Sequence, residues 1–187
     1  MSTPDPTPPP DTFRTDTERG VFALRPVDVA ADLPLVHDWM HQPHVVPYWQ
    51  QDWPAERLRG YLLDQFAGDA SRPCLGLLAG EPVSYWEVYR PVRDPLGDAY
   101  PARPTDLGVH LLIGRRDLTG SGLGTVLLRA VRDGLWQADP ACDRIVAEPD
   151  VRNVPSVRAF GKAGFHRHDD IDLPGKTAAL MIAERSS

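Results

Sequence analysis

The segment that most constrains the fold is a glycine-rich loop between two strongly patterned stretches, "DLGVHLLIG" (106–114) and "GLGTVLLRAVRDGLWQ" (122–137). The first stretch alternates its side chains with a period of two, which is typical of a strand, and the second repeats apolar residues at helical spacing. A strand that passes through glycines directly into a helix indicates an α/β domain. The backbone N–H groups at such a helix start can hold a phosphate or pyrophosphate.

The rest of the chain continues this alternation of short strands and helices. We predict further strands over 21–27, 74–79, 83–89, 143–148 and 178–184, and helices over 32–43 (capped by Asp32), 54–67 and 154–165. The predicted order is therefore β α α β β β α β α β. Hydrophobic residues make up 42% of the 187 residues, which is enough for the core of one domain.

The N-terminal segment has a different composition from the rest of the chain. Five of its first ten residues are proline, and charged residues, Thr and Gly dominate the next ten. Such a segment buries too little apolar surface to offset its ordering entropy. We expect a disordered tail over 1–19 and a folded domain over 20–187.

Charge and cysteine content narrow the possible partners. Twenty Lys and Arg against 26 Asp and Glu give a formal charge of -6, the wrong sign for binding a phosphate backbone. Cys74 and Cys142 lie far apart and form no CxxC pair, which favours a reducing cytoplasm. No apolar window is long enough to span a membrane. We expect a cytoplasmic monomer or homodimer with no nucleic-acid or membrane partner.

No metal site is expected from the histidines. His37 and His41 are four residues apart, but Asp38 stands where a zinc protease helix needs Glu. The segment "HRHDD" (166–170) is interpreted as a solvated loop. The glycine loop also departs from two nucleotide motifs: a dinucleotide fingerprint would need glycine at Thr125, and a P-loop would need Gly-Lys-Ser/Thr. A plain strand-to-helix connection without a ligand stays open at this point.

Two separated motifs then give a resemblance. "LTGSGLGTVLLRAV", a strand ending in "AEPD", and "RNVPSVRAFGKAGF" together resemble the acyl-coenzyme A signature of the GCN5-related N-acetyltransferases, over roughly residues 21–184. The resemblance implies an α/β fold with a mixed, mostly antiparallel sheet, splayed parallel strands 4 and 5, and flanking helices. It also implies acyl-CoA as co-substrate and no metal.

The resemblance assigns the donor site residue by residue. Gly122 and Gly124 are the pattern glycines, whereas Thr119 stands where the family has Arg or Gln. Phe160 replaces the tyrosine that protonates the leaving thiolate, so Ser156 or water would substitute. An amide near Leu112 or Ile113 would polarise the thioester carbonyl. The implied donor-binding residues are Leu112, Ile113, Thr119, Gly120, Ser121, Gly122, Leu123, Gly124, Thr125, Asn153, Ser156 and Phe160.

A narrower resemblance concerns the acceptor. "HDWMHQPHVVPYW", "GVHLLIG" and "AEPDVRN" are similar to the hydroxamate siderophore acyltransferases, and more distantly to aminoglycoside 6'-N-acetyltransferases. The aminoglycoside enzymes have an aspartate at the place of His110, so the histidine favours the siderophore branch. The implied reaction transfers acetyl, succinyl or a related acyl group to the N-hydroxylated side chain of lysine, cadaverine or ornithine.

Two strand ends are predicted to meet at the reacting nitrogen. Strand alternation places His110 on one face with Gly108 and Leu112, and Glu148 ends the strand over 143–148. Because the family's parallel strands splay apart there, we expect Glu148 to act as base and His110 to orient the hydroxylamine. Asp150 is the rival base, or a cap of the following helix.

The acceptor pocket is expected to have two walls. His44, Tyr48 and Trp49 lie on an aromatic loop, and Trp86 and Glu87 lie on a strand whose alternation sends only one of them inward. Two other functions stay open. The negative charge suits an aminoglycoside acceptor, and the departures at Thr119 and Phe160 suit a CoA-binding module without catalysis.

Overall fold

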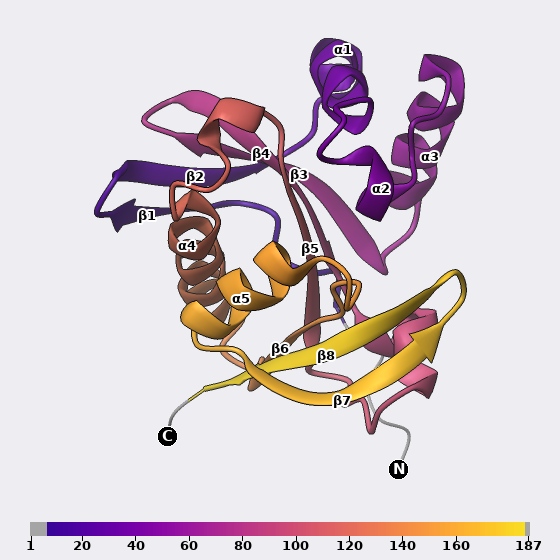
Figure 1. Ribbon diagram of the computed structural model, residues 1–187, viewed down its shortest axis with the longest axis vertical. Coiled ribbons are helices and arrows are strands. Elements are labelled where there is room, and N and C mark those ends of the chain that lie inside the picture. The colour runs from indigo at the N-terminus through magenta and orange to yellow at the C-terminus, as the bar shows by residue number, and fades with distance from the viewer. Residues whose placement is uncertain (1–6, 186–187) are drawn as a thin grey trace.

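The computed structural model describes residues 7–185. In this range the chain forms an eight-stranded sheet in the order β1-β2-β3-β4-β5-β6-β8-β7 (Figure 1). The strands are β1 (Phe13–Thr17), β2 (Gly20–Pro26), β3 (Ser71–Leu78), β4 (Glu81–Tyr89), β5 (Leu107–Ile113), β6 (Arg144–Ala147), β7 (His166–Leu173) and β8 (Lys176–Glu184). The helices are α1 (Val29–Met40), α2 (Val46–Trp49), α3 (Ala55–Ala67), α4 (Leu123–Ala138) and α5 (Val154–Lys162), with short 3-10 turns η1 (Pro91–Arg93), η2 (Pro95–Asp98) and η3 (Arg116–Leu118).

Strand direction changes at one point in this sheet. β5 and β6 are parallel, joined by the crossover helix α4, and every other neighbouring pair is antiparallel. The parallel pair is short: Leu107 pairs with Ile145 and Gly108 with Val146, and beyond these residues the strands separate. The predicted α/β fold with a mixed, mostly antiparallel sheet is therefore confirmed. The parallel strands are fifth and sixth rather than fourth and fifth because β1 precedes them.

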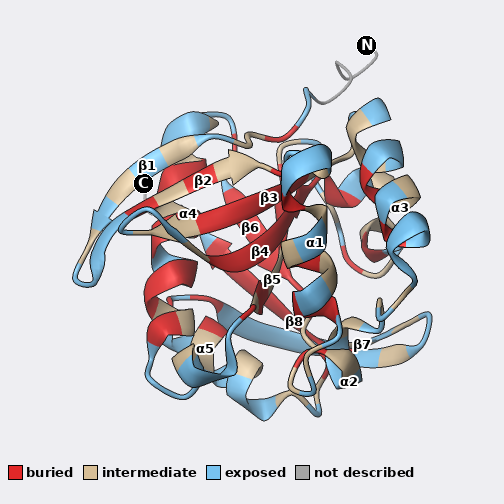
Figure 2. Ribbon diagram, turned by 90° about the horizontal axis from the view of Figure 1, so that it is seen from above, coloured by how far each residue is buried: buried red, intermediate tan, exposed pale blue. Residues whose placement is uncertain are grey.

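Helices cover both faces of the sheet. α1 and α3 lie over one face and α4 and α5 over the other, so that the central strands are buried between them (Figures 1 and 2). α4 presents Leu127, Val131 and Leu135, four residues apart, to the sheet, and all three are almost fully buried. This stripe matches the helical periodicity in the sequence, and it anchors the helix whose N-terminus follows the glycine loop.

The prediction of a disordered tail over 1–19 is wrong for its second half. Residues 13–17 form β1, which pairs with β2 from Phe13 opposite Leu24 to Thr17 opposite Gly20. The Phe13 ring packs over Gly134 of α4, where a Cβ would lie 2.2 Å from a ring carbon. "FRTDT" has one large apolar side chain, so its alternation is weak as a sequence signal. Residues 1–6 lie outside the described part.

Two other local predictions need correction. Asp32 was expected to cap the first helix, but Asp28 is the N-cap, because its side chain accepts the N–H groups of Ala30 and Ala31. Asp32 instead pairs with Arg25 and accepts the Asp28 N–H. Residues 166–170, predicted as a solvated loop, belong to the exposed edge strand β7, whose polar composition hides it.

Candidate active site

Two adjoining cavities lie beside the place where β5 and β6 separate. The smaller has a volume of about 220 Å³ and contains His110, Glu148 and Glu87 in its lining. The larger, about 810 Å³, extends to the glycine loop before α4. Residues that line both cavities are Tyr48, Trp49, Leu111, Asn153 and Ser156. The two cavities therefore adjoin at these residues, and we call the smaller the acceptor chamber and the larger the donor cleft.

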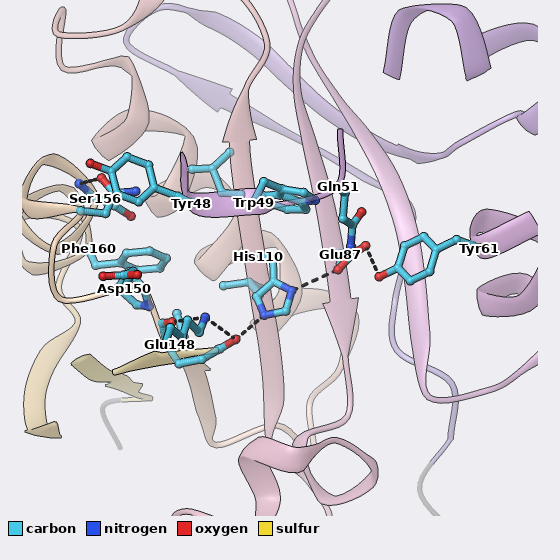
Figure 3. Close-up of a pocket in the computed structure, with 16 residues that line it drawn as sticks. Tyr48, Trp49, Gln51, Tyr61, Glu87, His110, Glu148, Asp150, Ser156 and Phe160 are labelled. Carbon is cyan, nitrogen blue, oxygen red and sulfur yellow. Dashed lines mark hydrogen bonds and ion pairs between the residues drawn. The ribbon is translucent and has the colours of Figure 1, made fainter. Parts of the chain in front are cut away.

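His110 and Glu148 face each other across the separated strands (Figure 3). Each comes two residues after the last β5–β6 pair, that of Gly108 with Val146. The Nε2 of His110 contacts Oε1 of Glu148, and its Nδ1 lies 3.1 Å from Oε2 of Glu87 on β4. Glu87, His110 and Glu148 thus form a continuous row along one wall of the acceptor chamber, which we call the Glu-His-Glu row.

The residues of the row stay ionised near neutral pH. Burial alone would lower the pKa of His110, but the carboxylates of Glu148 and Glu87 outweigh it and raise this pKa to about 10. Burial would raise the pKa of Glu148, but His110, Lys176 and Tyr89 together lower it to about 2. At neutral pH, His110 is therefore an imidazolium that donates from both ring nitrogens, and Glu148 is a carboxylate.

Glu87 is the more enclosed end of the row. Three donors surround its Oε1, at 2.8 Å from the Tyr61 hydroxyl, 3.0 Å from the Gln65 amide and 3.0 Å from the Tyr85 hydroxyl. Burial would raise the pKa of Glu87, but His110 and the hydrogen bonds from Gln65 and Tyr61 lower it overall. With both oxygens engaged, Glu87 is suited to fixing the imidazolium rather than to contacting substrate.

Glu148 is the end of the row nearer the donor side. Its Oε2 accepts a hydrogen bond of 2.7 Å from the Tyr89 hydroxyl. Lys176 on β8 lies 3.6 Å from its Oε1 and donates to its main-chain oxygen at 2.7 Å. The carboxylate therefore lies among three donors and next to the space where β5 and β6 diverge. Glu148, like Glu87, has both oxygens engaged, and it differs from Glu87 in lying where β5 and β6 diverge.

Asp150 lines the chamber, but its oxygens are already used. Arg152 contacts them through its side chain at 2.6 to 3.1 Å and its N–H at 2.8 Å. The predicted alternative, that Asp150 caps the next helix, is wrong: Asn153 is the N-cap of α5, because its Oδ1 accepts the Ser156 N–H. Asp150 instead shapes the turn between β6 and α5.

The two-walled acceptor pocket is only partly as predicted. Glu87 points into the chamber, whereas Trp86 points to the opposite face of the sheet, where it is fully buried and donates to Ser84. Trp49 stands edge-on to the His110 ring, with 6.0 Å between ring centroids. His44 lines the donor cleft and contacts the Ile113 carbonyl at 2.8 Å, so it is placed to hold the end of β5 rather than an acceptor.

Most of the predicted donor-binding residues line the donor cleft: Leu112, Ile113, Thr119, Gly120, Gly122, Gly124, Thr125, Asn153 and Ser156. Three others lie elsewhere. The side chain of Leu123 is in the core, and Phe160 packs in the core against Phe165 and reaches the acceptor chamber. Ser121 is exposed, and its hydroxyl donates to the Leu118 carbonyl within the loop.

The loop before α4 fits a phosphate group. Gly120 and Gly122 have φ of +72° and +83°, a conformation that side chains disfavour. Among the described residues no side chain caps α4, so its first N–H groups are available to an anion. A Cβ on Gly124 would lie 3.6 Å from Ile113 and 3.8 Å from Ala159, narrowing the cleft between β5 and α5.

Several residues that line the chamber or donate to its carboxylates went unrecognised in the sequence. Tyr85 and Tyr89 share the face of Glu87 on β4, and strand alternation would have revealed them. Tyr61 and Gln65 are four apart on α3, but nothing in the sequence indicates that this helix packs over Glu87. Lys176 follows a glycine turn and gives no signal.

Neither a metal site nor a membrane span appears in the structure as described. Across residues 7–185 no group of three or more His, Cys, Asp or Glu side chains is arranged to hold a metal ion. Likewise, none of the helices within that range is both long and apolar enough to cross a bilayer.

The chain resembles one known family and several of its members. The family model described as "Acetyltransferase (GNAT) domain" matches residues 28–173. Lysine N-acyltransferase MbtK of Mycobacterium sp. (strain MCS) is 36% identical over 165 residues, covering 88% of this chain and 68% of the relative. N-hydroxyputrescine acetyltransferase of Acinetobacter baumannii is 30% identical over 176 residues, covering 94% and 84%.

A solved structure agrees with these relatives. AAC(6')-Ib in complex with paromomycin and acetyl-CoA superposes with a TM-score of 0.79 at 27% identity, covering 88% of this chain and 93% of the other. The family model covers most of the chain. The glycine motif lies at the start of α4, and the motif from Arg152 to Phe165 lies at α5, after β6. The chain therefore belongs to the GNAT family of acetyltransferases and is an acyl-CoA-dependent transferase.

Proposed function

We propose that this transferase acylates an N-hydroxylated amine, the side chain of lysine or ornithine or one end of cadaverine, to form a hydroxamate for a siderophore. The observation on which this rests is the Glu-His-Glu row, which sets a cation between two carboxylates at the reacting end of the chamber. Because both carboxylates are already paired with the His110 cation, the row suits a neutral nucleophile rather than a charged one. The names of the two relatives, a lysine N-acyltransferase and an N-hydroxyputrescine acetyltransferase, support the same class of acceptor.

The proposed chemistry is a direct transfer. An N-hydroxylated amine is less basic than an alkylamine, so it is mostly neutral near pH 7 and needs no deprotonation before attack. Its nitrogen forms a bond to the thioester carbonyl carbon, the C–S bond breaks, and the sulfur leaves as a thiolate. The nitrogen of the adduct is strongly acidic, so even the weakly basic carboxylate of Glu148 can accept its proton.

Other side chains position the groups that react in this step. His110 holds Glu148 through one N–H and is itself held by Glu87 through the other. His110 keeps part of its side chain, 30%, exposed toward the chamber, where it can contact the acceptor. Phe160 has no proton to give, so the Ser156 hydroxyl or a water protonates the thiolate, and Ser156 lines both cavities.

An aminoglycoside acceptor is the second candidate, favoured by the likeness to AAC(6')-Ib and by the formal charge of -6. Two observations weigh against it. The chamber volume of about 220 Å³ is small for a multi-ring polycation, since drug-sized ligands occupy about 300–1,000 Å³. The chamber carboxylates of Glu87, Glu148 and Asp150 each already have a cationic partner.

The test is a substrate panel with purified protein. Acetyl-, succinyl- and malonyl-CoA are each combined with N-hydroxylated lysine, ornithine and cadaverine, with the parent amines, and with kanamycin. Thiol release measures turnover, and the iron(III) colour of a hydroxamate identifies the product. We expect the hydroxylated acceptors to exceed the parent amines and kanamycin in kcat/KM. Faster turnover of kanamycin, or no turnover of any hydroxylated acceptor, would overturn the proposal.

A further inference from the structure

Residues 119–122 of the glycine loop, which include the cleft-lining Thr119, Gly120 and Gly122, carry no charged side chain. Thr119 stands at the position where the resemblance expects Arg or Gln, and its hydroxyl donates to the Arg116 carbonyl at 2.7 Å. The Ser121 hydroxyl is likewise turned inward, at 2.9 Å from the Leu118 carbonyl. This part of the loop therefore provides backbone N–H groups alone, and the cations that line the donor cleft, Arg158 and Lys162, come from α5. A diphosphate has two negative charges.

A cation reaches this loop from a distant part of the chain. Arg19, at the tip of the β1–β2 hairpin, donates from Nη2 to the Ser121 carbonyl at 2.6 Å, across 102 positions of sequence. The same nitrogen lies 4.0 Å from the point where a Cβ on Gly122 would be. Arg19 therefore lies at the edge of the loop whose amides begin α4.

The hairpin turn is built to place this side chain. The Arg19 N–H donates to the Thr17 hydroxyl at 3.1 Å, and that hydroxyl donates to the Gly20 carbonyl at 2.7 Å. Gly20 has a φ of +111°, which only glycine adopts readily. Across residues 7–185, the Ser121 carbonyl is the partner found for the Arg19 guanidinium, so its remaining N–H groups stay available to a second acceptor.

We propose that Arg19 binds the diphosphate of the coenzyme A donor and adds a positive charge to the backbone N–H groups of the loop. This assignment rests on the acyl-CoA donor of the proposed function and adds a residue from outside both sequence motifs. A guanidinium suits this task because its planar set of donors matches phosphate oxygens while one N–H keeps the Ser121 carbonyl. The β1–β2 hairpin is thereby part of the donor site.

Calorimetric titration with coenzyme A and with pantetheine, which lacks phosphate, tests the assignment without relying on turnover. We expect Arg19→Ala to raise the Kd for coenzyme A about tenfold, the size of a charged hydrogen bond, and to leave the Kd for pantetheine unchanged. Arg19→Gln keeps a donor for the Ser121 carbonyl but not the charge, so it should bind coenzyme A as weakly as Arg19→Ala. Arg14→Ala removes an exposed cation from the same hairpin and should match the unaltered protein.

The outcomes separate the possible explanations. An unchanged Kd for coenzyme A in Arg19→Ala would overturn the assignment while leaving the donor in place. Full recovery in Arg19→Gln would show that the positive charge of Arg19 is not needed at the diphosphate, and equal weakening of pantetheine would make Arg19 a loop-positioning residue; either result overturns the assignment. Failure of the unaltered protein to bind coenzyme A would overturn both the donor and the role of Arg19. Thermal melting of each variant verifies that it is folded.

Discussion

At the scale of single residues, the proposed chemistry depends on how His110 is charged. Two buried carboxylates hold it as an imidazolium, and it in turn keeps them ionised. None of the three is independent, since removing the cation leaves two buried like charges that face each other across its place. The row therefore acts as one unit whose charge is set by mutual contact rather than by solvent.

Replacing His110 by Gln tests the row directly. We expect kcat with a hydroxylated acceptor to fall on the order of 100-fold, because Glu148 loses the partner that keeps it ionised and oriented. The Kd for coenzyme A should change little, since His110 does not line the donor cleft. Steady-state kinetics and calorimetry distinguish the two effects. A fully active variant would exclude His110 from the reaction.

The raised pKa of His110 also predicts how stability depends on pH. In the unfolded chain the imidazole titrates near its ordinary pKa of 6.5, and in the folded protein near 10. The stabilisation is therefore complete below about pH 6.5 and is lost as pH rises toward 10, with a slope of up to about 1.4 kcal/mol per pH unit. Urea unfolding of the unaltered protein and of His110→Gln from pH 6 to 10 measures this. Parallel curves for the two proteins would contradict it.

At the scale of elements, the separation of β5 from β6 depends on a close contact at its base. Gly108 is the last β5 residue paired with β6, and a Cβ there would lie 2.2 Å from the Tyr89 ring. Tyr89 in turn donates to Glu148. The position of Glu148, the proposed base, is thus tied, through one aromatic ring, to the lack of a side chain on the neighbouring strand.

Gly108→Ala is expected to move this ring. The added methyl must displace Tyr89, so we expect a loss of about 1–3 kcal/mol in the free energy of unfolding and lower kcat. Gly60→Ala on α3 is the control, because a Cβ at Gly60 meets nothing within 4 Å. Gly175 is not used as a control site, because its positive φ would strain any side chain. The Gly60 variant should keep both activity and stability. Urea unfolding and kinetics measure the contrast; equal behaviour of the two variants would contradict it.

The elements also show what could be predicted from the sequence. α4 and its loop were predictable because a helical repeat and glycines agree over many residues. The pairing of His110 with Glu148 followed from alternation on one strand, the end of another, and the splayed parallel strands that the family resemblance implies. β1 and β7 were not predicted because they are polar edge strands. The roles of Glu87 and Lys176 depend on strand register and on a hairpin, which no local sequence pattern encodes.

At the scale of the whole molecule, a second buried ion pair joins distant segments. Asp106, fully buried before β5, accepts from Arg144 on β6 at 2.6 and 2.9 Å, from Tyr100 at 2.8 Å and from the Arg103 N–H at 2.9 Å. The cluster ties the long connection over 90–105 to the paired base of β5 and β6. It fixes the end of the sheet opposite the site.

Asp106→Asn leaves Arg144 without its buried counter-charge. We expect the free energy of unfolding to fall by about 3–5 kcal/mol. Asp117→Asn, which breaks an exposed pair with Arg115, is the matched control and should leave the urea midpoint unchanged. Chemical denaturation of both variants tests this. A small loss for Asp106→Asn would mean that the connection over 90–105 is held by apolar packing instead.

The short pairing of β5 with β6 also bears on how the donor fits between these strands. Within residues 7–185, β5 and β6 share two residue pairs, and beyond these the ladder between them stops; the carbonyls of Ile113 and Glu148 are contacted by the side chains of His44 and Lys176 instead of a neighbouring strand. The pantetheine arm of coenzyme A contains amide groups like those of a peptide chain. We expect the donor to act as a missing strand, and the sheet to be complete only in the enzyme that has acyl-CoA bound.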